Sequence, residues 1–210
     1  DIRKIMFTDL EDRQKYVPDA EDIAVGWCPG IAARNWQNDA FSPRTGLVYT
    51  PTSNTCGIQR VVEGEYVPGD GYTLRERGGQ APRPPGEEYA GELQANDPVA
   101  SETVWSIRWT SANNTPVMAT GGDLLFQGGA NEGVVRAFDA RTGEVLWQQR
   151  TNSGVIGVPS TYAVDGVQYI AVQSGWGVDA AAMGRRLDGL RDTNNFVPQG
   201  GVVWVFALER

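Results

Sequence analysis

Short apolar runs recur along the chain, and each is bounded by Gly, Pro, Asn or Asp. The clearest runs are GLVYTPTS (46–53), DLLFQGG (123–129), VQYIAVQSG (167–175) and VVWVFAL (202–208). They are rich in β-branched and aromatic residues, and no long stretch repeats its apolar positions every 3.6 residues. We therefore expect an all-β chain of short strands joined by tight turns, with at most a short helical turn over residues 16–23.

One motif occurs twice at a fixed separation. Each residue of the second copy follows its counterpart by 42 positions, the pairs being Ala95 and Ala137, Asp97 and Asp139, Glu102 and Glu144, and Trp105 and Trp147. A period of about 40–45 residues is typical of four-stranded propeller blades. The aspartate suits a turn because it caps its own backbone, and the tryptophan is expected to fill the space between neighbouring blades. The pattern predicts β-propeller blades, with two similar hairpins of an antiparallel sandwich as the alternative.

The length limits how many blades the chain can supply. At this period an eight-bladed ring needs roughly 340 residues, whereas the chain has 210. Residues 1–210 therefore form either a small propeller of four or five blades or a single portion of a larger one. Segments 64–90 and 178–199 are interpreted as loop insertions, which leave less length for strands and favour the larger ring.

Composition excludes several kinds of function. The chain has 18 basic and 26 acidic residues and a net charge of −8, which disfavours nucleic acid as a partner. It has no histidine, so Ser-His-Asp catalysis, the common zinc sites and c-type haem attachment within this chain are excluded. No apolar run reaches membrane-spanning length. The chain begins neither with Met nor with a signal peptide, which suggests a mature or processed chain.

Acidic residues gather near the start of the chain, and two interpretations of them remain open. The cluster is either a solvated face or a docking patch for a basic partner, and it comprises Asp9, Glu11, Asp12, Asp19, Glu21 and Asp22.

Two cysteines, Cys28 and Cys56, flank a segment that is predicted to form a strand pair with a turn at residues 42–46. Because a hairpin brings its ends together, we expect a disulfide, which would contribute roughly 3.5 kcal/mol in the chain-entropy model. A disulfide implies an oxidising compartment. The alternative is a pair of buried free thiols.

Two longer segments carry a family resemblance. CPGIAARNWQNDAFSPRTGLVYTP (28–51) resembles a segment of the pyrroloquinoline quinone (PQQ)-dependent alcohol dehydrogenases, the methanol and ethanol dehydrogenase family, and residues 116–177 resemble the C-terminal blades of that family. The resemblance implies the C-terminal sector of an eight-bladed propeller in the periplasm, with PQQ and a calcium or lanthanide ion in a central pocket. It also implies hydride transfer from a small alcohol or an aldehyde to PQQ, and electron transfer to a cytochrome c-type or other acceptor.

The family's catalytic aspartate, its metal ligands and its adjacent-cysteine disulfide have no counterpart in this sequence. We therefore expect no catalytic residue and no metal ligand in this chain. They would lie on an N-terminal propeller fragment or companion subunit of roughly 300–400 residues.

The resemblance also assigns cofactor contacts. Asn35 matches the family asparagine that hydrogen-bonds the quinone; its alternative is an ordinary turn residue. Trp36, beside it, is expected either at the cofactor or in core packing. Gly175 and Trp176 match the Gly-Trp region near the PQQ carboxylates, with an inter-blade tryptophan as the alternative. Asn114 belongs to NNTP, which replaces the family's Trp and Gly-Gly and predicts a more polar wall.

Two other functions stay open. Some periplasmic propellers share the Ala-x-Asp and Trp repeat but act as non-enzymatic scaffolds in outer-membrane assembly, and a shared fold does not exclude such a role. A complete small propeller enzyme with its own carboxylate chemistry is the other alternative, although no paired carboxylates stand in a recognisable catalytic context.

Overall fold

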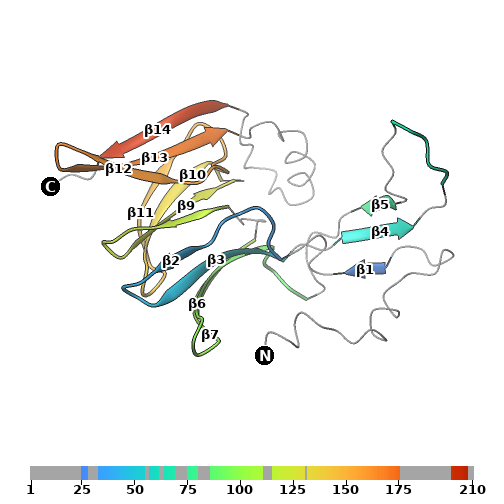
Figure 1. Cartoon of the computed structure of the whole chain (residues 1–210), viewed down its shortest axis with the longest axis horizontal. Helices are drawn as coiled ribbons and strands as arrows, with labels where there is room; N and C mark the ends of the chain where they lie inside the picture. Colours follow the sequence, from blue (N-terminus) through green and yellow to red (C-terminus); the bar gives the residue numbers. More distant parts are fainter. Residues whose placement is uncertain are drawn as a thin grey trace.

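The computed structural model describes residues 25–27, 33–54, 57–61, 64–69, 75–79, 86–110, 115–130, 132–175 and 200–207. Within these ranges all regular structure is β, and no helix occurs. Three sheets fan out side by side as blades, and a fourth, smaller sheet lies away from them (Figure 1). The prediction of an all-β propeller portion is confirmed for the described part of the chain.

Two of the blades have four strands each, and the third has three. Blade I has the order β2 (Ala40–Ser42), β3 (Leu47–Ser53), β6 (Gly91–Asp97), β7 (Glu102–Trp109). Blade II consists of β8 (Val117–Ala119), β9 (Leu124–Gly129), β10 (Val134–Asp139) and β11 (Val145–Arg150). Blade III consists of β12 (Ser160–Val164), β13 (Val167–Gly175) and β14 (Gly201–Ala207). All strand pairs within the blades are antiparallel.

The 42-residue repeat is a repeat of structure. Ala95 lies opposite Trp105 and Ala137 lies opposite Trp147, and in both blades a β-bulge directly follows the alanine. A bulge at the same place re-aims the strand in the same way. The tryptophans therefore occupy equivalent positions in blades I and II.

The turns after the two alanines also match. The Asp97 carboxylate accepts hydrogen bonds from the backbone N–H groups of the second and third residues after it, at 2.8 and 3.0 Å. The Asp139 carboxylate does the same at 2.7 and 3.0 Å. Ser101 and Gly143, again 42 residues apart, both have a positive φ. The predicted role of aspartate as the turn cap is confirmed.

Each pair of neighbouring blades encloses its own apolar core. The core between blades I and II consists of Leu47, Tyr49, Leu93, Ala95, Val117, Leu125, Phe138 and Ala140. The core between blades II and III consists of Phe126, Val135, Ala137, Val155, Ile170 and Val172. The side chains of β9 alternate between the two cores, because successive residues of a strand point to opposite faces. Blade II is therefore sandwiched, while blades I and III each have one face without a described blade against it.

The final strand belongs to a blade of this same chain. The apolar run 202–208 overlaps β14, which pairs with β13 over seven positions, from Tyr169↔Ala207 to Gly175↔Gly201. The sequence alone does not reveal this pairing, because 25 residues separate the two strands, whereas four residues separate β9 from β10. Segment 178–199, interpreted as an insertion, lies outside the described residues.

The outlying sheet combines one strand from before blade I with two strands from the connection between β3 and β6. Its order is β1 (Val25–Trp27), β4 (Gly57–Val61), β5 (Arg75–Gly79). Segment 64–90 is thus not purely loop, because it contributes β5. Cys28 and Cys56 lie outside the described residues, and so do residues 16–23 and the acidic cluster at the start of the chain.

Candidate functional site

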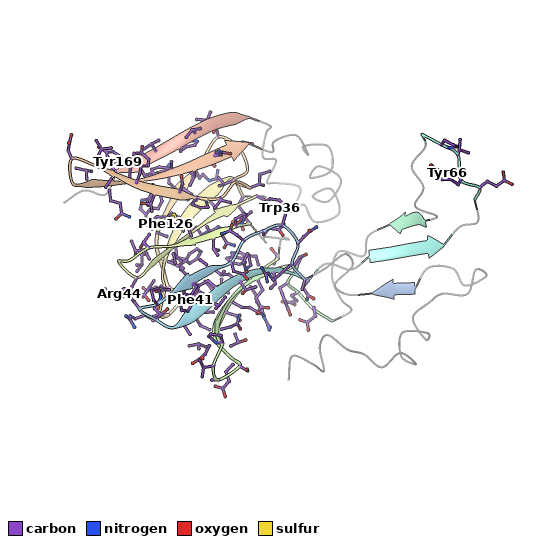
Figure 2. The ribbon with its side chains drawn as sticks, viewed as in Figure 1. Trp36, Phe41, Arg44, Tyr66, Phe126 and Tyr169 are labelled. Carbon is purple, nitrogen blue, oxygen red and sulfur yellow. The ribbon has the colours of Figure 1, made fainter. Side chains whose placement is uncertain are left out.

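The blades have two distinct ends. The hairpins that join β2 to β3 and β8 to β9 lie at one end, where Figure 2 shows Arg44. Trp36 lies at the opposite end of the same blade. The first end carries a charged cluster that joins blades, and the second carries a cavity.

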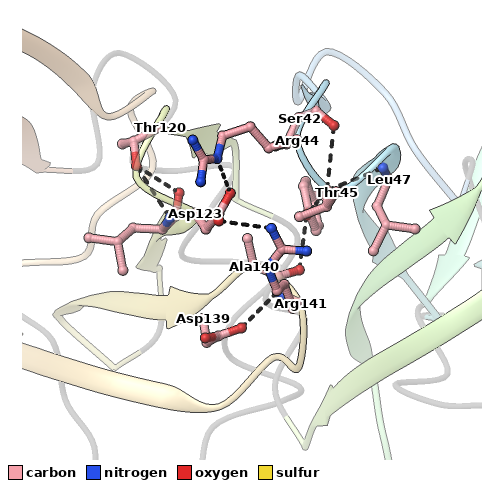
Figure 3. Close-up of polar contacts among 11 residues, drawn as sticks. Ser42, Arg44, Thr45, Leu47, Thr120, Asp123, Asp139, Ala140 and Arg141 are labelled. Atoms are coloured by element: carbon pink, nitrogen blue, oxygen red, sulfur yellow. Dashed lines mark hydrogen bonds and ion pairs between the residues drawn. The ribbon is translucent and has the colours of Figure 1, made fainter.

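The charged cluster joins blades I and II at the hairpin end (Figure 3). Arg44, in the β2–β3 turn, contacts the Asp123 carboxylate at 3.0 Å, and Arg141, in the β10–β11 turn, contacts its other oxygen at 3.0 Å. Hydrogen bonds from Arg44 and then Arg141 hold the pKa of Asp123 below its ordinary value. Asp123 is thus held by one arginine from each blade, so the cluster acts as an inter-blade clamp rather than as a reactive site.

The cavity at the other end has a volume of about 470 Å³. Its walls come from the segment before β2, the connection before β12, and the facing ends of β13 and β14. The lining residues are Trp36, Ile156, Gly157, Gln173, Ser174, Gly175, Gly200, Gly201, Val202 and Val203. The structure therefore brings Trp36 and Gly175, two of the residues singled out from the sequence, to one cavity, although they are 139 positions apart (175 − 36).

Trp36 is presented to the cavity by a loop with its own polar anchors. The backbone N–H of Asn35 donates to the side-chain oxygen of buried Gln37 at 3.2 Å. The Asn38 amide donates to the Val117 carbonyl of blade II at 3.0 Å. The indole itself is 59% exposed. The ring is therefore not packed into either of the two described cores, and it lines the cavity instead.

An ion pair closes the same loop. Arg34 contacts the Asp39 carboxylate at 2.8 Å. Burial raises the pKa of Asp39, and this effect outweighs the lowering by Arg34. The other carboxylate oxygen, Oδ1, is buried without a described hydrogen-bond partner. Asp39 anchors the loop beneath Trp36 and does not line the cavity.

Gly175 lies where only a glycine fits. Its φ is +154°, and a Cβ at this position would overlap the carbonyl oxygen of Gly200. Its backbone N–H donates to the Gly154 carbonyl at 2.7 Å. Glycine thus allows a close approach of two backbone segments here, since the neighbour is the start of the β14 segment.

Beneath the cavity lies a buried serine pair that sequence reasoning did not find. The Ser153 N–H donates to the Ser174 hydroxyl oxygen at 3.1 Å, and that hydroxyl donates to the Ser153 carbonyl at 2.9 Å. Both residues are buried. This reciprocal pair fixes the loop that carries Ile156 and Gly157 against β13. The available signal was weak: Ser174 follows Ile170 and Val172 at every second position of the strand, on its apolar face.

Gln173 is the second residue that sequence reasoning missed. Its side chain lies over Gly157, where an added Cβ would come within 3.2 Å of the Gln173 Cβ and 3.3 Å of its amide oxygen. The absence of a side chain at Gly157 leaves room for this amide at the cavity wall. Gln173 is exposed, so its amide is available to a ligand.

The lining defines what the site can do. The lining residues named above carry no charged side chain, so they provide no general acid or base. Exposed glycine backbone, an indole and an amide suit one edge of a flat, carbonyl-bearing ring. Any carboxylates on such a ligand would need cationic partners from outside this lining. Within the described ranges, no group of three or more His, Cys, Asp or Glu could hold a metal ion.

Of the other residues predicted to contact the cofactor, the structure describes only Asn35. The side chain of Asn35 is exposed beside Trp36. Asn114 and Trp176 lie outside the described residues, immediately before Thr115 and immediately after Gly175. As for membrane association, the described part of the chain holds no helix long and apolar enough to cross a bilayer.

Comparisons with known proteins give a consistent result. The family model for the PQQ-type "glucose/ethanol/alcohol dehydrogenase, beta-propeller domain" matches residues 86–170. The quinoprotein alcohol dehydrogenase PedH of Pseudomonas putida is 37% identical over 187 residues, which cover 86% of this chain and 29% of that protein. The quinohemoprotein alcohol dehydrogenase of Comamonas testosteroni is 38% identical over 159 residues, which cover 71% of this chain and 22% of that protein.

A solved structure agrees with these relatives. A europium-containing methanol dehydrogenase superposes with a TM-score of 0.75 and 32% identity, and the match covers 87% of this chain and 34% of that one. The chain therefore spans about a third or less of the length of the proteins that it resembles.

Proposed function

We propose that this chain, which belongs to the family of PQQ-dependent quinoprotein alcohol dehydrogenases, forms the sector of a propeller ring that holds one edge of the quinone. The reaction of the whole ring would be oxidation of a small alcohol or an aldehyde. The observation that carries the proposal is the cavity that unites Trp36 and Gly175 at one end of the blades, in a chain whose relatives are dehydrogenases.

Binding and orientation would be the task of this chain. The Asn35 amide would bond a ring carbonyl of the quinone, because an amide donates and accepts at once. The Trp36 indole would cover an apolar face of the ligand, and Gly175 would keep the β13–β14 junction tight. Asn114 and Trp176, which adjoin described residues of the same region, would extend this wall. When bound, PQQ supplies the two-electron acceptor; the protein supplies position and electrostatics.

The rest of the ring would complete the chemistry. The described lining carries no base and no metal ligands, so a carboxylate base and a calcium or lanthanide ion would come from an N-terminal fragment or companion subunit. The solved relative named above contains europium, which supports a metal of this kind for the assembled protein. Electrons would pass to a cytochrome c-type or other acceptor, as the name of the quinohemoprotein relative suggests. A periplasmic location accords with these assignments.

The scaffold alternative receives less support. Its basis was the blade repeat alone, whereas the relatives named above, which are 32–38% identical to this chain, are alcohol dehydrogenases. A cavity lined by glycine backbone, an exposed indole and an amide is also a feature that a purely structural blade does not need.

Quinone retention tests the proposal. In the complete protein that carries this chain, Asn35→Ala should release PQQ during gel filtration because one orienting hydrogen bond is lost, with an expected weakening of roughly tenfold. Asn96→Ala is the matched control: Asn96 bonds Thr103 at the surface of blade I and does not line the cavity. Bound quinone per protein is measured by absorbance, and full retention in Asn35→Ala rejects the assignment of Asn35.

A further inference from the structure

A buried glutamine in blade II leaves half of its amide unused. Gln127, on strand β9, is 1% exposed, and its amide nitrogen donates to the Thr115 carbonyl at 2.9 Å. Its amide oxygen is also buried, and no described residue donates a hydrogen bond to it. A buried acceptor without a donor destabilises a fold. Stability alone therefore does not explain a glutamine at this position.

Gln127 lies where the strand pattern predicts an apolar side chain. Leu125, two positions earlier, belongs to the core between blades I and II, and residues two positions apart point to the same face of a strand. The β8–β9 hairpin lies at the other end of this strand, so Gln127 lies toward the end of the blades that carries the cavity. It is not among the residues that line the cavity, so the amide lies behind the wall.

The amide fixes the chain that leads into β8. Thr115 lies two residues before β8; its carbonyl accepts the bond from Gln127, and its hydroxyl donates to the Gly128 carbonyl. Because both bonds are buried and join the same two segments, they hold the entry to β8 against the end of β9. The carbonyl of the first residue of β8 in turn accepts a bond from the Asn38 amide at 3.0 Å. The loop that presents Trp36 to the cavity is therefore anchored on this segment.

Gly128 extends the same contact to the opposite wall. A Cβ at Gly128 would come within 2.6 Å of Val155 atoms, so Val155 packs directly on the glycine. The Val155 N–H donates to the Gly129 carbonyl at 3.2 Å, and Val155 forms a parallel bridge with Gly175. The next residue, Ile156, lines the cavity. Two walls of the cavity therefore meet at the segment that the buried amide holds.

We propose that Gln127 is a positioning residue for the cavity: its bond to Thr115 holds the segments that carry Trp36 and Ile156 in a fixed relation. The inference rests on the proposed function in taking this cavity as the place where the quinone edge binds. Gln127 acts through Thr115 and touches no ligand. An apolar side chain of similar size would fill the same space and would remove the unpaired oxygen, but it would leave the Thr115 carbonyl without this donor. The expected signature is a displaced cavity wall in a protein of unchanged stability.

Hydrogen exchange in the complete, quinone-free protein tests this role. In Gln127→Met, which keeps the length of the side chain, the amides of Val155 and Gly175 should exchange roughly fivefold faster, because one hydrogen bond no longer holds the wall. The thermal midpoint should stay within about 2 °C of the parent, since removal of the unpaired oxygen offsets the lost bond. Gln149→Met, on the exposed outer strand β11, is the matched control and should alter neither quantity. Unchanged exchange at both amides in Gln127→Met overturns the proposal.

Thr115→Val gives a second test that does not depend on the folding of Gln127→Met. This variant removes the hydroxyl bond to Gly128 and keeps a branched side chain, so the amides of Val155 and Gly175 should again exchange faster than in the parent. Exchange at the parent rate would mean that Gly128 does not couple the entry of β8 to the cavity wall, and it overturns the proposal.

Quinone retention provides a readout that a purely structural residue would not change. In the PQQ-loaded complete protein, Gln127→Met should weaken retention by roughly fivefold at an unchanged thermal midpoint. A lower midpoint with unchanged retention would make Gln127 a structural residue only and overturns the proposal. If the complete protein holds no PQQ at all, the proposed function fails, whereas the exchange experiment on the quinone-free protein still decides the role of Gln127.

Discussion

Gly175 illustrates how a single residue constrains the candidate site. Its positive φ and its approach to the Gly200 carbonyl leave no room for a side chain. The sequence signal, a glycine within SGWG at the end of a strand, predicted a place near the quinone, and that role stays a prediction. It did not predict the contact with Gly200, because β14 arrives from 25 residues further along the chain.

Gly175→Ala should destabilise the protein by about 2 kcal/mol or more, since both the backbone conformation and the contact with Gly200 resist a Cβ. Gly201→Ala is the matched control, because an added Cβ there meets nothing within 4 Å. Urea unfolding of the two variants measures the difference. Equal stability of Gly175→Ala and the parent would show that the β13–β14 junction is looser than described.

The Asp123 clamp makes a pH-dependent contribution. Arg44 and Arg141 lower the pKa of Asp123 in the folded state, so its contribution to stability is fully present above the unfolded-state pKa of about 4. The contribution is lost as the pH falls through the lowered folded-state value.

Asp123→Asn should therefore be less stable than the parent at neutral pH, and the difference in unfolding free energy should shrink as the pH falls below about 4. Denaturant midpoints measured from neutral to acidic pH supply the comparison. A difference that stays constant across this range would mean that the carboxylate charge is not what Arg44 and Arg141 stabilise.

At the scale of elements, the blade repeat could be predicted from the sequence, whereas the contacts between distant segments could not. The Asp turns and the position of Trp105 followed from residue types at a fixed period. By contrast, Trp36 lies in a loop whose course depends on distant anchors such as the Val117 carbonyl. No local pattern distinguishes an exposed tryptophan of that kind from a buried one, and for this reason the sequence left its role open.

The two tryptophans should respond differently to truncation. Trp105→Ala should cost about 3 kcal/mol of stability, because it empties part of the core between blades I and II and removes the bond to Ala140. Trp36→Ala should leave the unfolding free energy nearly unchanged and should instead weaken quinone retention. Thermal unfolding and bound quinone, measured on both variants, separate packing from ligand contact. A large loss of stability in Trp36→Ala, together with quinone loss but no destabilisation in Trp105→Ala, would contradict the site described here.

The outlying sheet bears on the two cysteines. Its strands β1 and β4 pair up to Trp27 and Gly57. Cys28 and Cys56 lie outside the described residues, so the disulfide stays a prediction from the sequence. The hairpin argued from the sequence, β2–β3, has a different register and does not itself align these positions.

We therefore expect a Cys28–Cys56 disulfide. Alkylation of the denatured protein should modify neither cysteine without reductant and both after reduction, as read from intact mass. Modification of both cysteines without reductant would favour the alternative of two free thiols.

At the scale of the whole molecule, the described blades form an incomplete ring. The chain spans 29% and 22% of the two curated relatives described above. Blades I and III each have one face without a described blade against it. The free face of blade III is apolar, whereas the free face of blade I includes a buried Glu92 that pairs with Arg108 at 3.0 Å. Burial of this apolar face against another part of the protein would stabilise the sector.

The measurement that tests the account most directly is the quinone content of the complete, folded protein after it is loaded with PQQ and calcium or a lanthanide. The account predicts one tightly held PQQ per ring, reduced on addition of a small alcohol and lost in Asn35→Ala. A fully folded protein that holds no PQQ under these conditions would contradict it.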